Sequence, residues 1–296
     1  MRRLLRNALV MIIVLVCVAA TVHLFDWRTI GRALTKLHVG LLLGAGIPLL
    51  LATSAMRGWR WLVVLGIRAG RTNLWQSFCA NGAAAGLASL TPFQIGEAIK
   101  IRMIPDHHGK GWRLGVSAFF LERLLDLGTL CSIGLGGLAI HFGYAWLAPL
   151  ALLLPLGGCL VLSLLCRSLR LPGKLLPYTE VLRHTPRVVM AAALTIPLWL
   201  LYVALWWVAT HAMNVPLDLT QVAILLGGVM LVVVASMTPG GLGVSELGSR
   251  SVLLWLGVSA ADAEIGAIAI RLLTPMIAVI GLACLVPLLG QLHRKK

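Results

Sequence analysis

The sequence predicts an all-α polytopic membrane protein with about six full spans and two broken re-entrant helical hairpins, arranged as an inverted internal repeat. Three observations lead to this fold class. The 296-residue chain is 59% hydrophobic and only 12% charged, about half the charged fraction of a soluble domain. Its apolar residues fall into runs close to the roughly 20 residues that cross a bilayer as a helix. A similar Thr-Pro break interrupts two of these runs.

The repeated break divides the chain into two halves. Residues 89–97 read Ser-Leu-Thr-Pro-Phe-Gln-Ile-Gly-Glu, and residues 236–246 read Ser-Met-Thr-Pro-Gly-Gly-Leu-Gly-Val-Ser-Glu. The segments 123–126 and 271–274 match at almost the same offset, close to half the chain. Matches at one offset indicate an internal duplication. We therefore expect one membrane domain without a soluble domain, made of a first repeat over 1–143 with its break at 91–97 and a second over 144–296 with its break at 238–246.

The apolar runs locate the elements in order. The six predicted full spans lie near 5–25, 39–56, 114–142, 145–166, 188–210 and 262–288. Two further runs, 74–92 and 219–237, lead into the breaks, and shorter apolar pieces follow them at 95–104 and 244–257. The polar stretch 26–38, between the first two spans, is expected to be a loop.

The basic residues favour breaks that turn back inside the bilayer. If both broken elements are re-entrant, most of the 25 Lys and Arg residues lie on one side, which the positive-inside rule assigns to the cytoplasm. Both termini are then cytoplasmic, and only Arg28, Arg32 and Lys36 lie on the opposite side. Each half contributes three crossings, an odd number, so the halves are inverted relative to each other, a plan typical of transporters.

Two groups of charged residues are candidates for a binding site. Arg57-Gly58-Trp59-Arg60-Trp61 is either an interfacial anchor or a segment in which Arg57 or Arg60 binds a lipid phosphate. Glu122, Arg123 and Asp126 lie in an apolar run, where each charge costs roughly 2.5 to 3.5 kcal/mol at mid-depth. They are expected to face protein or a water-filled cavity, or to neutralise one another near the interface.

The breaks themselves are candidate translocation elements, since a helix that restarts after them exposes N–H groups and its positive dipole end to an anion. Ser245 is expected to cap the second restarting helix. Glu97 and Glu246 either neutralise the helix ends or act as proton-exchanging or cation-binding carboxylates. Arg123 and Arg271 are expected to be their partners or phosphate ligands, with Glu122, Asp126 and Glu264 completing the network. The break residues counted in the site are Thr91, Pro92, Gly96, Thr238, Pro239, Gly240, Gly241 and Gly243.

Three segments carry a resemblance to a known family. Residues 92–97, 122–126 and 239–246, and more weakly 57–61, resemble the recurring motifs of the lysylphosphatidylglycerol synthase transmembrane, or flippase-like, family. The resemblance implies an integral membrane protein of the kind fused, in the multiple peptide resistance factor, to an aminoacyl transferase, with the membrane part moving the modified lipid between leaflets. No transferase domain follows residue 290, so the chain resembles a stand-alone flippase part. Many members have a second glycine where Gln94 or Ile95 stands, which affects close phosphate approach at the first break.

The expected function is therefore a lipid translocase of the bacterial cytoplasmic (inner) membrane, acting on a lipid with a polar or anionic head group. The alternatives are a membrane-embedded lipid-modifying enzyme, for which Glu122 and Asp126 are the candidate acid–base pair, and a non-transporting lipid-binding partner of a biosynthetic enzyme. No catalytic motif, metal-ligand spacing or cofactor motif is found, so we expect no enzyme activity, metal or cofactor. The basic residues lie at membrane ends and argue against nucleic acid. Ion or proton coupling, a homodimer and the identity of the lipid, whether an aminoacyl phosphatidylglycerol, a polyprenyl phosphate or a hopanoid, stay open.

Overall fold

The computed structural model describes residues 15–91, 96–102, 111–168, 179–236 and 238–294. All regular structure in these residues is helical, so the predicted all-α class is confirmed. Five helical segments are long and apolar enough to cross a membrane. They are α3 (Val39–Leu65), α6 (Gly111–His141), α7 (Leu147–Ser168), α9 (Thr185–Ala212) and the segment Ala260–Leu289. These correspond to five of the six predicted full spans. The sixth, 5–25, is described only as the helix Leu15–Leu24.

The last predicted span consists of two helices, α12 (Ala260–Arg271) and α13 (Leu273–Arg294). The junction has a local cause. Pro275 has no N–H to donate to the carbonyl of Arg271, and its ring crowds that carbonyl. Arg271 is therefore the last residue of α12.

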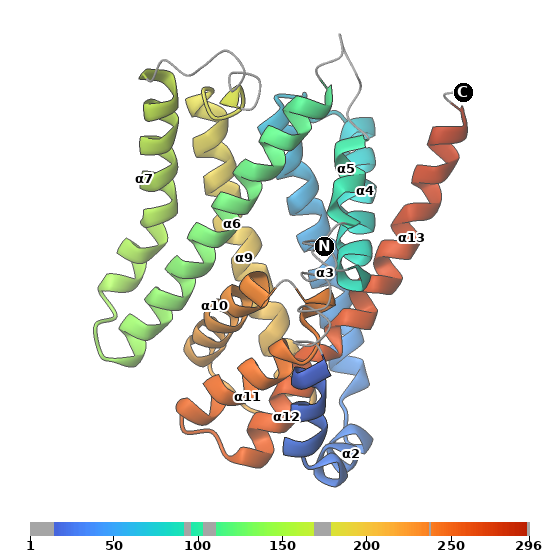
Figure 1. The fold of residues 1–296 in the computed structure, drawn as a ribbon, viewed down its shortest axis with the longest axis vertical. Helices are drawn as coiled ribbons and strands as arrows, with labels where there is room; N and C mark the ends of the chain where they lie inside the picture. Colours follow the sequence, from blue (N-terminus) through green and yellow to red (C-terminus); the bar gives the residue numbers. More distant parts are fainter. Residues whose placement is uncertain (1–14, 92–95, 103–110, 169–178, 237, 295–296) are drawn as a thin grey trace, which may run out of the picture.

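The two predicted helix breaks are present. The first element consists of α4 (Arg71–Leu90) and the short helix α5 (Ile99–Arg102), and the second of α10 (Leu219–Ser236), the 3-10 turn η2 (Pro239–Gly241) and α11 (Val244–Trp255). In each element the two helices pack against each other. The first lies in the upper half of the view and the second in the lower half (Figure 1). Pro92 lies outside the described residues.

The largest helix contacts are between α4 and α13, α3 and α9, and α10 and α6. Small residues permit the first of these. A Cβ added to Gly86 would lie 2.7 Å from the Cα of Gly281, so the two backbones touch. This is the close approach that small residues allow between helices in a bilayer, and it explains why α4 packs so extensively against α13.

The predicted loop at 26–38 is wrong, because it contains α2 (Trp27–Thr35). Asp26 begins the helix by accepting hydrogen bonds from the backbone N–H of Arg28 and Thr29 at 3.0 and 3.3 Å. The hydroxyl of Thr29 also donates to this carboxylate, and these bonds lower the pKa of Asp26. Ile30 is buried, whereas Arg28 and Arg32 are exposed. α2 is therefore an amphipathic helix at the lower end of the molecule (Figure 1).

The contact between α4 and α13 predicts the effect of adding one methyl group. Gly86→Ala should lower the free energy of unfolding by about 1 to 3 kcal/mol, the usual cost of overpacking. The measurement is the thermal unfolding midpoint of the purified protein in detergent. Gly157→Ala on α7 is the matched control, since a Cβ there meets nothing within 4 Å. A Gly86→Ala protein as stable as this control would show that the two helices do not touch here.

Candidate functional site

The end of α4 meets the second break at η2. A Cβ added to Gly240 would lie 2.5 Å from the backbone oxygen of Ser89, near the end of α4. Gly240, Gly241 and Gly243 have φ values of 54°, 69° and 76°, a region that L side chains rarely adopt. The glycines therefore serve two purposes: they reverse the chain after α10, and they let it touch the first broken element.

The first break is closed by a side chain. The hydroxyl of Thr91 donates to the carbonyl of Leu87 at 2.8 Å and accepts from the N–H of Gly96 at 3.0 Å. A Cβ on Gly96 would overlap the backbone of α4 at Leu87 and Ala88. Gly96 is thus required by close approach, and Thr91 ties the returning chain to the end of α4.

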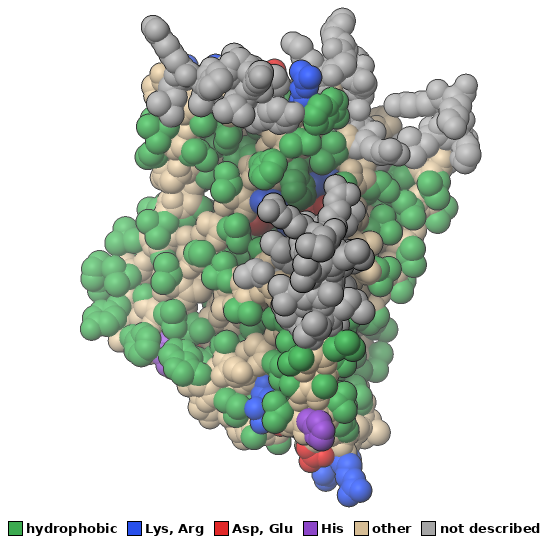
Figure 2. Space-filling model, viewed as in Figure 1, with side chains coloured by type: hydrophobic (Ala, Val, Ile, Leu, Met, Phe, Trp, Pro, Cys, Tyr) green, Lys and Arg blue, Asp and Glu red, His purple; other side chains and the backbone are tan. Residues whose placement is uncertain are grey.

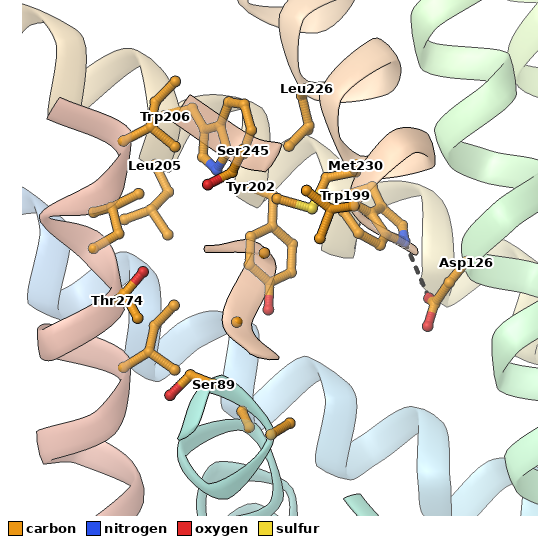
Figure 3. Close-up of a pocket in the computed structure, with 18 of the residues that line it drawn as sticks. Ser89, Asp126, Trp199, Tyr202, Leu205, Trp206, Leu226, Met230, Ser245 and Thr274 are labelled. Carbon is orange, nitrogen blue, oxygen red and sulfur yellow. Dashed lines mark hydrogen bonds between the residues drawn. The ribbon is translucent and has the colours of Figure 1, made fainter. Parts of the chain in front are cut away.

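A cavity of about 240 Å³ lies where the two breaks meet. Its wall is largely aromatic and aliphatic, with Trp199, Tyr202 and Trp206 from α9 and Met230 from α10 (Figure 3). Ser89 and Thr274 add hydroxyl groups from α4 and α13. The charged side chains that line the cavity are Arg57, Glu97, Arg123, Asp126 and Arg271. An apolar wall with a few convergent charged groups is the usual composition of a ligand site.

Glu97 is the centre of the charges at the first break. Arg57 donates to its Oε1 at 2.7 Å, and Arg123 donates to its Oε2 at 2.5 Å. The ammonium group of Lys100 lies 3.3 Å from the same Oε2. Glu97 is only 3% exposed, and such a burial is sustainable only when the charge is paired. The expected partnership between Glu97 and Arg123 is confirmed.

Arg60 lies behind the cavity and is fully buried. It donates to both oxygens of Asp126, at 2.6 and 3.3 Å, and to Glu122 at 3.3 Å. Thr195 on α9 accepts a further bond at 3.0 Å. Both interpretations offered for this arginine, interfacial anchor and phosphate ligand, are therefore wrong, because its donors are engaged inside the protein. Because the charge of Arg60 is neutralised, α3 continues to Leu65, beyond the predicted end at 56.

Glu122 and Asp126 form their shortest ion pairs with residues of other helices, and not with Arg123 of the same helix. Glu122 also accepts from Lys100 at 2.5 Å, while Arg123 lies 3.7 Å from Asp126. The indole N–H of Trp199, in the cavity wall, donates to Asp126 at 3.0 Å (Figure 3). The hydrogen bond of Trp199 thus joins the cavity surface to the buried charges. The expectation that the three residues face protein or a cavity is confirmed.

At the second break, Arg271 takes the role that Arg123 has at the first. It donates to the carbonyl of Gly240 at 2.6 Å and lies 3.2 Å from Glu246. Gly243 begins α11 without a side-chain cap, so the predicted capping by Ser245 is wrong. The hydroxyl of Ser245 instead donates to Glu246 at 2.7 Å. Glu246 stands in the first turn of α11, where its charge also complements the helix dipole.

Glu264 does not join this network, contrary to expectation. It pairs with Arg250 at 3.1 Å and accepts from the N–H of Asp26 at 2.8 Å. The predicted residues that line the cavity are Arg57, Glu97, Arg123, Asp126, Thr238, Gly240, Gly241 and Arg271. The others described, Arg60, Thr91, Gly96, Glu122, Gly243 and Glu246, lie outside its lining and support it through the contacts given above. Pro239 begins η2.

Hydrophobic side chains cover most of the flanks in Figure 2, and the charged side chains in view gather in one recess and toward the ends. This surface suits a protein embedded in lipid. Residues 7–281 match a family described as the lysylphosphatidylglycerol synthase TM region. The chain belongs to this family. It is thus an integral membrane protein of a family related to lipid metabolism or transport. No curated protein and no solved structure matches the chain.

Some site residues of this lysylphosphatidylglycerol synthase TM family member have only a weak signal in the sequence. Lys100 follows Glu97 by three residues, a spacing at which helical side chains meet. Trp199 and Tyr202 also stand three apart, and an indole or phenol inside an apolar run needs a polar partner when buried. Ser89, Ser245 and Thr274 stand in the repeated segments 89–97, 236–246 and 271–274, but nothing in the sequence marks these small polar residues as lining a cavity.

The charge balance of the cavity favours an anion. Its described lining holds three arginines and two carboxylates. The excess is one positive charge, presented by planar groups whose paired N–H donors fit a carboxylate or phosphate.

Removing Arg60 tests whether its ion pairs hold the helices together. Arg60→Gln should lower the free energy of unfolding by about 3 to 5 kcal/mol, because buried Asp126 would lose its closest cation and Glu122 would keep only Lys100. The check is the thermal unfolding midpoint in detergent. Arg68→Gln, at an exposed arginine just after α3, should leave the midpoint unchanged. Equal midpoints for the two variants would contradict a structural role for Arg60.

Proposed function

We propose that this chain is a lipid translocase that moves a lipid with an anionic, phosphate-bearing head group between leaflets. The observation that carries the proposal is the meeting of two broken helical elements at a cavity lined by three arginines. Irregular backbone inside a bilayer is tolerated where it is enclosed by protein or lines a water-filled cavity. Here it lines a cavity of about 240 Å³.

In this mechanism the head group enters the cavity while the acyl chains stay in the bilayer. Arg57 and Arg123 on one side and Arg271 on the other provide the donors for phosphate oxygens. The aromatic wall around Trp199 and Tyr202 contacts the glycerol and the first carbons of the chains. Nothing in this arrangement requires the head group to lose its charge, because the arginines replace the water that it leaves.

The proposed topology has two re-entrant hairpins in an inverted repeat. Two ion pairs support it: Glu97 with Arg123 and Glu246 with Arg271 join the glutamate after each break to the arginine at the matching position of the same half. We place both termini on the cytoplasmic side of a bacterial inner membrane. A homodimer or an associated lipid-biosynthetic enzyme is compatible with this scheme.

We propose no enzymatic role for the acidic pair on α6. A general acid or base must reach the proton that it transfers, whereas Glu122 is fully buried against Arg60 and Lys100. Asp126 is held by Arg60 and Trp199. A non-transporting lipid-binding partner would share the cavity but would not move lipid, so a transport measurement separates the two functions.

Transport should depend on the arginines of the cavity. Arg123→Gln is expected to slow lipid movement by about tenfold or more, since a hydrogen bond to a charged group contributes about 1.5 to 3 kcal/mol. The measurement uses protein reconstituted in liposomes with a fluorescent phosphatidylglycerol, whose outer-leaflet fraction is quenched by dithionite. Arg250→Gln is the control, because Arg250 has a similar exposure and its own carboxylate partner but does not line the cavity. Equal rates for the two variants would exclude the proposed path.

Labelling of single cysteines tests the topology. In a cysteine-free background, Ala69→Cys and Arg113→Cys flank the first broken element, and Asp218→Cys and Ala261→Cys flank the second. A membrane-impermeant maleimide should reach the first pair only from the cytoplasmic side and the second pair only from the opposite side. Two members of one pair labelled from different sides would mean that the broken element between them crosses the bilayer.

A further inference from the structure

The carboxylate of Glu97 occupies the donors that an anionic head group would need. We infer that Glu97 is an internal counter-anion, which the phosphate of the lipid must displace from Arg57 and Arg123 before the lipid can be carried. The inference rests on the proposed function, because it concerns the occupancy of the same cavity. It adds a residue that sets the affinity and the charge specificity of the site.

The geometry places the competition at two guanidinium groups. Arg57 and Arg123 line the cavity, and each donates to a different oxygen of Glu97, at 2.7 and 2.5 Å. A phosphate that bridges the same two side chains presents its oxygens to the same N–H groups. Each guanidinium gives the N–H of one terminal nitrogen, Nη2, to Glu97. A phosphate that bridged the two side chains through these same N–H groups would take the place of the carboxylate.

Lys100 gives the displaced carboxylate a second cation. Its ammonium group is fully buried, bonded to Glu122 at 2.5 Å, and already 3.3 Å from Glu97. Movement of Glu97 toward Lys100 would therefore keep it paired while the phosphate takes the arginines. Among the described residues, the ion pairs of Arg57 run to Glu97 alone. Glu97 or the ligand then neutralises Arg57, which is largely enclosed with a side chain 12% exposed.

The exchange selects for charge. A neutral head group cannot replace the interaction of Glu97 with two guanidinium groups. Glu97 therefore stays bound to Arg57 and Arg123, and the neutral head group does not bind. Glu246 does not play the same part in the second half. Its partner Arg271 is also fixed to the carbonyl of Gly240 at 2.6 Å, and Glu246 does not line the cavity.

Removal of the charge of Glu97 should tighten binding of an anionic lipid. The full chain is purified in detergent, and its affinity is measured by calorimetry for dioctanoyl phosphatidic acid, for inorganic phosphate and for dioctanoylglycerol. Glu97→Gln should bind the phosphatidic acid about tenfold more tightly than the wild type. No carboxylate then competes for Arg57 and Arg123, so a larger fraction of the protein is ready to bind the phosphate. Glu264→Gln removes a carboxylate from a comparable ion pair outside the cavity and should change the affinity less than twofold.

The outcomes separate the inference from the proposed function. An unchanged or weaker affinity of Glu97→Gln for phosphatidic acid would overturn the exchange, and so would an equal gain for dioctanoylglycerol. A gain for inorganic phosphate as well supports it and identifies the phosphate group as sufficient. The proposed function is tested independently by lipid movement in wild-type liposomes.

A second variant keeps the test valid if Glu97→Gln does not fold. Glu97→Asp retains the negative charge beside Lys100, but its side chain is one methylene shorter and should hold the two arginines less well. It should bind phosphatidic acid about threefold more tightly than the wild type, since a weaker competitor leaves more sites open. An aspartate variant that binds no more tightly than the wild type would also overturn the inference.

Discussion

Compensation of charge in the absence of water governs this structure. Arg60 is fully buried, and it is stable there only because carboxylates of α6 and a hydroxyl of α9 surround it. A cation alone in hydrocarbon would cost several kcal/mol. The same requirement positions Lys100 against Glu122. These polar contacts hold α3, α6, α9 and the short helix α5 together. They matter in a bilayer because an apolar side chain packs about as favourably against lipid as against another helix.

The chemistry of the cavity depends on the arginines that lie at the edge of this buried network. Arg60 and Lys100 are enclosed, whereas Arg57, Arg123 and Arg271 reach the cavity with side chains that retain some exposure. The three arginines come from α3, α6 and the end of α12, and they meet at the cavity beside the two breaks. Trp199 joins the two regions, with one face in the cavity wall and its N–H on Asp126.

Composition and hydrophobic runs were sufficient to predict the helical class and five spans, because length and apolarity alone decide which segments suit a bilayer. The breaks were also predictable, since proline and adjacent glycines interrupt a helix by local sterics. The position of Arg60 was not, because the partner that neutralises a charge is set by tertiary packing between α3, α6 and α9. Glu264 was misplaced for the same reason. α2 was missed because its nine residues are too few and too polar to register as an apolar run.

The contact between Gly86 and Gly281 joins the first broken element to the last helix. The other principal contacts, α3 with α9 and α6 with α10, likewise unite helices from before and after residue 143. The two halves of the sequence are thus interleaved and cannot separate as independent rigid bodies without breaking the largest interfaces. A motion that opened the cavity and kept these interfaces would have to take place between units that each contain helices from both sides of residue 143.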